Sequence, residues 1–81
     1  MTNFDHYTEA RELASLLRKE NLDDFATSLI RAMEEGATGT EIFMALRWNI
    51  ERLLRANKCS EPTAAKARRL FDELDKALQQ P

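Results

Sequence analysis

The side chains best suited to acid–base or nucleophilic chemistry are His6 and Cys59, and each is the single residue of its type among 81. A lone histidine excludes a His-pair metal site, and we interpret His6 as a partly buried residue near a helix start. Cys59 follows Lys58 just before a predicted helix, an environment that can lower the pKa of a thiol. Nucleophilic catalysis also needs a base beside the thiol, and the only histidine lies far away in the sequence. We therefore interpret Cys59 as a half-exposed structural residue and expect no enzyme activity.

The carboxylates and the glycines lack the spacing of a catalytic or metal-binding motif. No acidic segment matches a calcium loop, and no pair of acids is flanked by the aromatic residues of a sugar-cleaving site. Gly36 and Gly39 have no following lysine, which a phosphate loop requires. We predict instead that Gly36 ends one helix in the left-handed conformation and that Gly39 lies in the first turn of the next. No cofactor and no metal are expected.

The position of Trp48, the single tryptophan, is the feature that points most directly to a function. At about 100° per residue, the apolar residues between positions 39 and 57 gather on one helix face, and Met44 and Trp48 fall on the opposite face. Either another element of the chain covers this pair or a partner does. Tryptophan and arginine are enriched among residues that dominate binding energy, and methionine adapts to a partner surface. The candidate partner-binding residues of this helix are Met44, Arg47, Trp48, Glu51, Arg52 and Arg55.

Charge is unevenly distributed along the chain, although the net charge is only −2. Residues 1–41 carry nine acidic and four basic side chains, whereas residues 42–81 carry five acidic and eight basic ones. This polarity predicts a second candidate surface, an acidic ridge that would receive a basic protein partner by electrostatic steering. The ridge consists of Glu20, Asp23, Asp24, Glu34, Glu35 and Glu41.

A basic corner between the last two predicted helices supports an alternative function, nucleic-acid binding by a small regulatory protein. Trp48 would lie near the basic side chains of this corner, and its ring could stack on a nucleic-acid base there. The pI of about 5.4 argues against this alternative, because a nucleic-acid reader usually has a basic overall balance. The corner consists of Arg52, Arg55, Lys58, Lys66 and Arg69.

The composition predicts an all-α protein, because valine is absent, strong helix formers dominate, and only two glycines and two prolines interrupt the chain. Short turns between the helices favour a single-domain antiparallel bundle of four helices over residues 1–81. In the alternative architecture, three helices pack as a unit and the fourth is exchanged with, or packed on, a second copy of the chain. The predicted helices cover about residues 4–20, 21–35, 39–57 and 60–78.

Capping residues mark the start of each predicted helix. Thr38 and Glu41 have the spacing of a capping box, in which the Glu41 carboxylate returns to the backbone N–H of Thr38. Asn3 is the expected N-cap of the first helix, Asn21 or Asp23 that of the second, and Ser60 that of the fourth. Asp23 and Asp24 also suit the positive end of the helix dipole.

The N-terminus does not resemble a signal peptide, and no apolar run is long enough for a membrane span. A single cysteine also fits a reducing compartment. We therefore expect a cytoplasmic protein with a free thiol and no membrane partner.

Three segments resemble small α-helical bacterial immunity proteins, such as the immunity partners of contact-dependent inhibition toxins and of colicin-like nucleases. The segments are Leu13-Ala14-x-Leu16-Leu17, Gly36-Ala37-Thr38-Gly39-Thr40-Glu41-Ile42 and Ala45-Leu46-Arg47-Trp48. The resemblance covers most of the chain and rests on pattern and size. It implies a cytoplasmic, non-enzymatic protein that binds one toxin domain tightly and blocks its action. The net charge of −2 departs from the strongly acidic balance of many nuclease-inhibiting members, so the activity of the toxin is not indicated.

Overall fold

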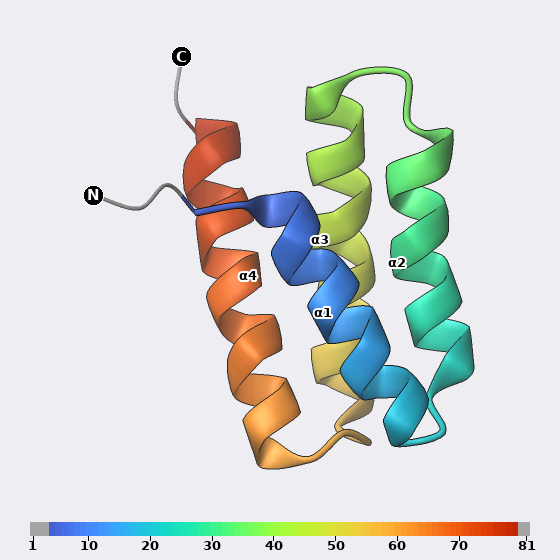
Figure 1. Ribbon diagram of the computed structural model, residues 1–81. Helices are drawn as coiled ribbons and strands as arrows, with labels where there is room; N and C mark the ends of the chain where they lie inside the picture. The colour runs from blue at the N-terminus through green and yellow to red at the C-terminus, as the bar shows by residue number, and fades with distance from the viewer. Residues whose placement is uncertain (1–3, 80–81) are drawn as a thin grey trace.

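The computed structural model describes residues 4–79, which form four α-helices and no strand (Figure 1). The helices are α1 (His6–Lys19), α2 (Asp23–Glu35), α3 (Gly39–Ala56) and α4 (Glu61–Gln79). Short connections join them, and Figure 1 shows the chain turning back at each one. The prediction of an all-α fold with four helices is therefore confirmed. None of these helices combines the length and the apolar character that crossing a membrane requires.

The hydrophobic core lies between the four helices, each of which packs mainly against two neighbours. α1 and α3 both contact α2 and α4. Apolar residues three or four positions apart form one stripe on each helix, and burial of these stripes is the main force that holds the helices together. The fully buried large side chains are Leu13, Leu17, Leu29, Leu46, Ile50, Leu53, Leu70 and Leu74.

The N-caps of the first two helices differ from those predicted. Asp5 caps α1, and its carboxylate accepts hydrogen bonds from the backbone N–H groups of Tyr7 and Thr8 at 3.1 Å each. Asn3 lies outside the described residues. Leu22 occupies the N-cap position of α2 and makes no side-chain capping hydrogen bond. Neither predicted cap is available there, because Asn21 lies in the left-handed region (φ 64°) just beyond α1 and Asp23 already belongs to the first turn of α2.

The N-cap of α3 is the predicted one, whereas Gly36, which precedes it, does not have the predicted conformation. Thr38 Oγ1 accepts a hydrogen bond from the backbone N–H of Glu41 at 3.1 Å. The return bond runs from the Thr38 hydroxyl to the Glu41 carboxylate at 3.3 Å, where the motif predicts the backbone N–H as donor. Gly36 is extended, with φ −72°, so the predicted left-handed conformation is wrong. Glycine is required there for space, because an added Cβ would overlap with Cγ1 of Ile42.

A polar clamp made by Glu20, Ser60 and Thr63 fastens the end of α1 to the start of α4. The Glu20 carboxylate accepts hydrogen bonds from the backbone N–H of Ser60 at 2.6 Å, from its hydroxyl at 2.8 Å, and from the Thr63 hydroxyl. The Thr63 bond and then the two Ser60 bonds lower the pKa of Glu20 below its ordinary value of 4.5. Glu20 thus accepts a hydrogen bond from the backbone N–H of Ser60, which has no acceptor within α4. A carboxylate from another helix therefore does what a capping side chain of α4 itself would otherwise do. Ser60, the predicted cap, donates its hydroxyl to Glu20.

Replacing Gly36 by alanine should reduce the free energy of unfolding by about 1–3 kcal/mol, because the new methyl group overpacks the contact with Ile42. Gly39→Ala is the matched control, since no atom lies within 4 Å of the Cβ it would add. That variant should be as stable as wild type or up to about 1 kcal/mol more stable. Urea unfolding followed by circular dichroism measures both. Equal stability of the two variants would contradict the close approach at Gly36.

Replacing Glu20 by glutamine should lower Tm at neutral pH, and the difference from wild type should shrink as the solution is acidified. Because folding lowers the pKa of Glu20, the carboxylate stabilises the fold above its ordinary pKa, and this contribution is lost as pH falls through the folded value. Thermal melting between about pH 2.5 and pH 7 measures the change. Glu35→Gln, on the exposed end of α2, is the control and should show a small difference throughout. A Tm difference for Glu20→Gln that is constant with pH would contradict the role of its charge.

Candidate functional site

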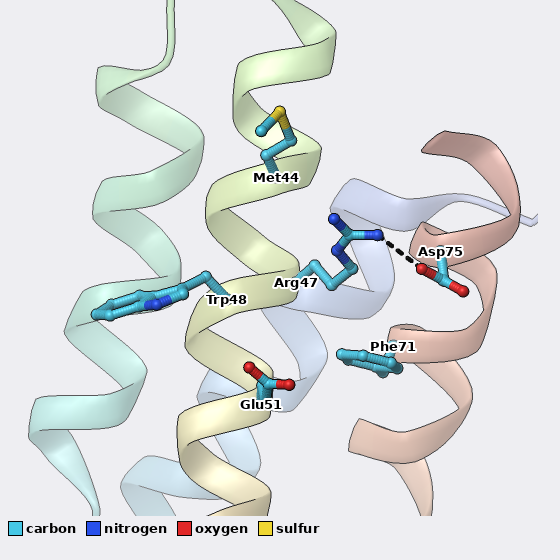
Figure 2. Close-up of a pocket in the computed structure, with 6 residues that line it drawn as sticks. All are labelled: Met44, Arg47, Trp48, Glu51, Phe71 and Asp75. Carbon is cyan, nitrogen blue, oxygen red and sulfur yellow. Dashed lines mark hydrogen bonds and ion pairs between the residues drawn. The ribbon is translucent and has the colours of Figure 1, made fainter. Parts of the chain in front are cut away.

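Met44 and Trp48 are the large apolar side chains that the described structure leaves most exposed, with 52% and 59% of their surface accessible. They lie one turn apart on the outer face of α3, and Figure 2 shows the indole projecting from that helix in the direction of α2. The inner face of α3 is already occupied by Leu46, Ile50 and Leu53. Of the two alternatives that the sequence left open, the first does not hold for residues 4–79, because no element among them covers this pair.

The Arg52 side chain packs against the Trp48 indole. Its guanidinium lies over the Trp48 ring, 5.0 Å from the centroid, and also 5.8 Å from the centroid of Phe25 in α2. A cation–π contact at an exposed site contributes about 0.5–1 kcal/mol, so the contact favours this orientation of the indole over others. An oriented indole loses less conformational entropy on binding than a freely rotating one.

A groove of about 400 Å³ lies between α3 and α4 beside Trp48. This volume is at the lower end of the range for binding sites and suits one or two apolar side chains. Figure 2 shows that its walls consist of three pairs, each made of residues one turn apart. The pairs are Met44 with Trp48, Arg47 with Glu51, and Phe71 with Asp75.

The polar rim of the groove is formed by ion pairs. Arg47 Nη1 lies 2.6 Å from Asp75 Oδ1 and joins α3 to α4, with each side chain about one-third exposed. Gln79 donates a hydrogen bond to the second Asp75 oxygen at 2.9 Å. Glu51 faces Arg55 of the next turn at 3.6 Å. A partner would therefore meet an apolar centre surrounded by charged groups, most of which already have partners.

The structure brings together the six candidate residues predicted on α3. Four of them line the groove, while Arg52 stacks on Trp48 and Arg55 pairs with Glu51. Sequence reasoning missed the contribution of Phe71 and Asp75 in α4, because a phenylalanine in an apolar helix stripe usually belongs to the core and an aspartate outside it usually faces solvent. The available signal was their spacing of one turn at the edge of that stripe. This spacing indicates a groove wall only once α4 is known to lie beside α3, and the sequence alone does not show that the two helices are neighbours.

The residues of the predicted acidic ridge do not all lie close together. Asp23 and Asp24 lie in the first turn of α2, whereas Glu34 and Glu35 lie in its last turn, roughly 16 Å away along the axis. Glu20 is engaged in the clamp with α4. The acids therefore lie in separate groups near the two ends of α2, and the acidic ridge as a partner surface stays a prediction.

The basic residues of α3 and α4 do not converge at one corner either. Lys66 faces α1, where its Nζ lies 2.8 and 3.0 Å from two carboxylates. Arg69 also faces the α1 side, 5.5 Å over the ring of Phe4. Arg52 lies on the opposite side of the α3–α4 pair, against α2. The cluster that supported a nucleic-acid surface is thus divided between two sides of the fold.

His6 and Cys59 lie near opposite ends of α1. His6 Nε2 is 3.3 Å from the backbone oxygen of Glu73, and its ring packs on Phe43, so the predicted partly buried position is confirmed. Cys59 is half-buried beside the clamp, where burial and then the charge of Glu20 raise the pKa of its thiol. The lowered pKa suggested by the sequence is therefore wrong, and the thiol is protonated at neutral pH. Within residues 4–79, no three His, Cys, Asp or Glu side chains are grouped to hold a metal.

Trp48→Ala should change the free energy of unfolding of the isolated chain by less than about 1 kcal/mol, because the ring is exposed and the lost contact with Arg52 is at the surface. Leu46→Ala, two positions away on the buried face, should cost about 2–5 kcal/mol. Urea unfolding measures both variants, and acrylamide should readily quench the fluorescence of the single tryptophan. A strongly destabilised Trp48→Ala variant, or an indole that stays protected from acrylamide even in dilute solution, would contradict the exposed position.

Comparisons with family models, curated proteins and solved structures give no match to this chain.

Proposed function

We propose that this chain is a non-enzymatic protein-binding module whose partner covers the surface around Trp48. The observation that carries the proposal is the indole of Trp48, which is exposed and packs against the Arg52 guanidinium. Removal of apolar surface from water contributes about 25 cal/mol per Å², so a partner that covers this ring and Met44 gains free energy. Tryptophan and arginine at the centre of a contact surface are also the residue types that most often dominate affinity.

The groove between α3 and α4 gives this surface its specificity. An apolar side chain of the partner would enter between Trp48 and Phe71, and its polar neighbours would meet Glu51 and the Arg47–Asp75 ion pair. This arrangement, with an apolar centre and a polar rim, is that of protein–protein interfaces in general. We further propose that the four helices form an antiparallel bundle, which keeps the two walls of the groove at a fixed separation.

For the biological role we propose immunity against a bacterial toxin in the cytoplasm. The support is the resemblance of three segments to small immunity proteins, one of which, the Ala45–Trp48 run, contributes Arg47 and Trp48 to the groove. A tightly bound chain of this kind would block a toxin by covering its surface and needs no chemistry of its own. The protonated, half-buried thiol of Cys59 fits a reducing compartment.

Co-expression with bacterial toxin domains tests this role, beginning with any toxin encoded beside the gene. Wild-type chain should restore growth of cells that produce the cognate toxin. Trp48→Ala should weaken binding of the purified toxin by about 30-fold, which corresponds to about 2 kcal/mol, because the contact centre is lost. Isothermal titration calorimetry measures the affinity. Ser15→Ala, an exposed position on α1, is the control and should bind like wild type.

Two outcomes would contradict the proposal. In the first, the co-expression assay fails. Either no contact-dependent inhibition toxin or colicin-like nuclease is neutralised, or Trp48→Ala protects cells as well as wild type does. In the second, the chain binds generic DNA or RNA with a steep dependence of log affinity on log salt concentration, which is characteristic of phosphate contacts. That result would favour the nucleic-acid regulator.

A further inference from the structure

The exposed residues of α3 are spaced symmetrically along the helix on both sides of Trp48. This residue lies at the middle of the 18-residue helix Gly39–Ala56. Four further residues lie within about 40° of it around the helix axis, at three- and four-residue intervals on either side. All five side chains are exposed. We call this set the α3 stripe, and it consists of Glu41, Met44, Trp48, Arg52 and Arg55.

The charges of the α3 stripe are complementary to those of a second, antiparallel copy. Glu41 lies seven residues before Trp48 and Arg55 lies seven residues after it. A two-fold axis through Trp48 would therefore place Glu41 of each copy opposite Arg55 of the other, and Met44 opposite the aliphatic stem of Arg52. A parallel arrangement would instead place like charges together. Antiparallel helix dipoles favour the same orientation.

We propose that the free chain forms a two-fold symmetric dimer in which the α3 stripes of two copies pack antiparallel. The interface would be self-complementary, as in most homodimers, with the two indoles at its centre. The molecule measures 36 × 28 × 22 Å, so an interface of standard size, about 800 Å² per partner, would take most of its largest face. One helical stripe about 21 Å long covers less than that, so the dimer is weak and depends on concentration.

This dimer covers Met44 and Trp48, which also line the groove between α3 and α4. Self-association and capture of another protein are therefore mutually exclusive at this surface. The dimer shields the apolar pair while no other partner is bound, and a partner with higher affinity displaces the second copy. The dimer itself does not depend on which partner that is.

Sedimentation velocity of the purified full-length chain over a wide concentration range tests the proposal. Wild type should show a reversible monomer–dimer equilibrium. Arg55→Glu should weaken the dimer about tenfold or more, because by symmetry each substitution removes two ion pairs and creates two repulsions. Glu41→Arg should act in the same direction. The double variant Glu41→Arg/Arg55→Glu restores both pairs with their charges exchanged and should return to within about threefold of wild type.

Arg18→Glu, an exposed position on α1, makes the same change of charge away from α3 and is the control. It should dimerise like wild type, and thermal melting of every variant shows that it is folded. The proposal is overturned if wild type stays monomeric at all concentrations, if Arg55→Glu has no more effect than Arg18→Glu, or if the double variant does not recover. Protection against a toxin is a separate measurement. A monomeric chain that protects cells overturns only the dimer, and a dimer without protection overturns only the immunity role.

Discussion

Each helix of this fold has one face for the core, and this limit determines what α3 presents to solvent. The inner face of α3 is filled by Leu46, Ile50 and Leu53, and its flanks contact α2 and α4. Within residues 4–79, no neighbouring helix covers the remaining face, so the apolar side chains there stay exposed to water. Met44 and Trp48 are on that face because of their position in the helical repeat. Their exposure is therefore a consequence of the packing, and the groove and the α3 stripe both depend on it.

Polar contacts then fix α4 relative to the other helices. The Glu20 clamp joins its first turn to α1, Lys66 joins its middle to two carboxylates of α1, and Asp75 joins its last turns to Arg47 of α3. Desolvation lowers the pKa of Lys66, but the hydrogen bonds that its ammonium donates to Glu9 and Glu12 raise the pKa by more, so the net shift is upward and the ammonium stays charged. Exposed ion pairs add little stability, typically about 0–1 kcal/mol each. Their main effect is to set the position of α4 along α1 and α3, and the walls of the groove follow from that position.

Local patterns were enough to predict the helices but not their contacts. The repeat of leucines and alanines predicted the buried face of each helix. The spacing of Thr38 and Glu41 predicted Thr38 as the N-cap of α3, because both residues lie within one helical turn. The clamp joins Glu20 to a serine 40 positions later, and nothing near either residue indicates the other. Lys66 was assigned to a basic corner for the same reason, since its carboxylate partners lie on α1. What the sequence could not supply was the identity of the neighbouring helix.

An exposed indole that suits a partner is also a site for unspecific association, and the charges near it limit that risk. Large apolar patches promote aggregation unless the surrounding groups restrict how two surfaces can meet. Glu41 and Arg55 lie at opposite ends of the α3 stripe, so shifted or parallel stacking of two copies brings like charges together or leaves charges unpaired. Arg52 covers one side of the ring in addition. The charges around Trp48 thus leave few favourable arrangements, and this restriction allows a small domain to carry a tryptophan on its surface.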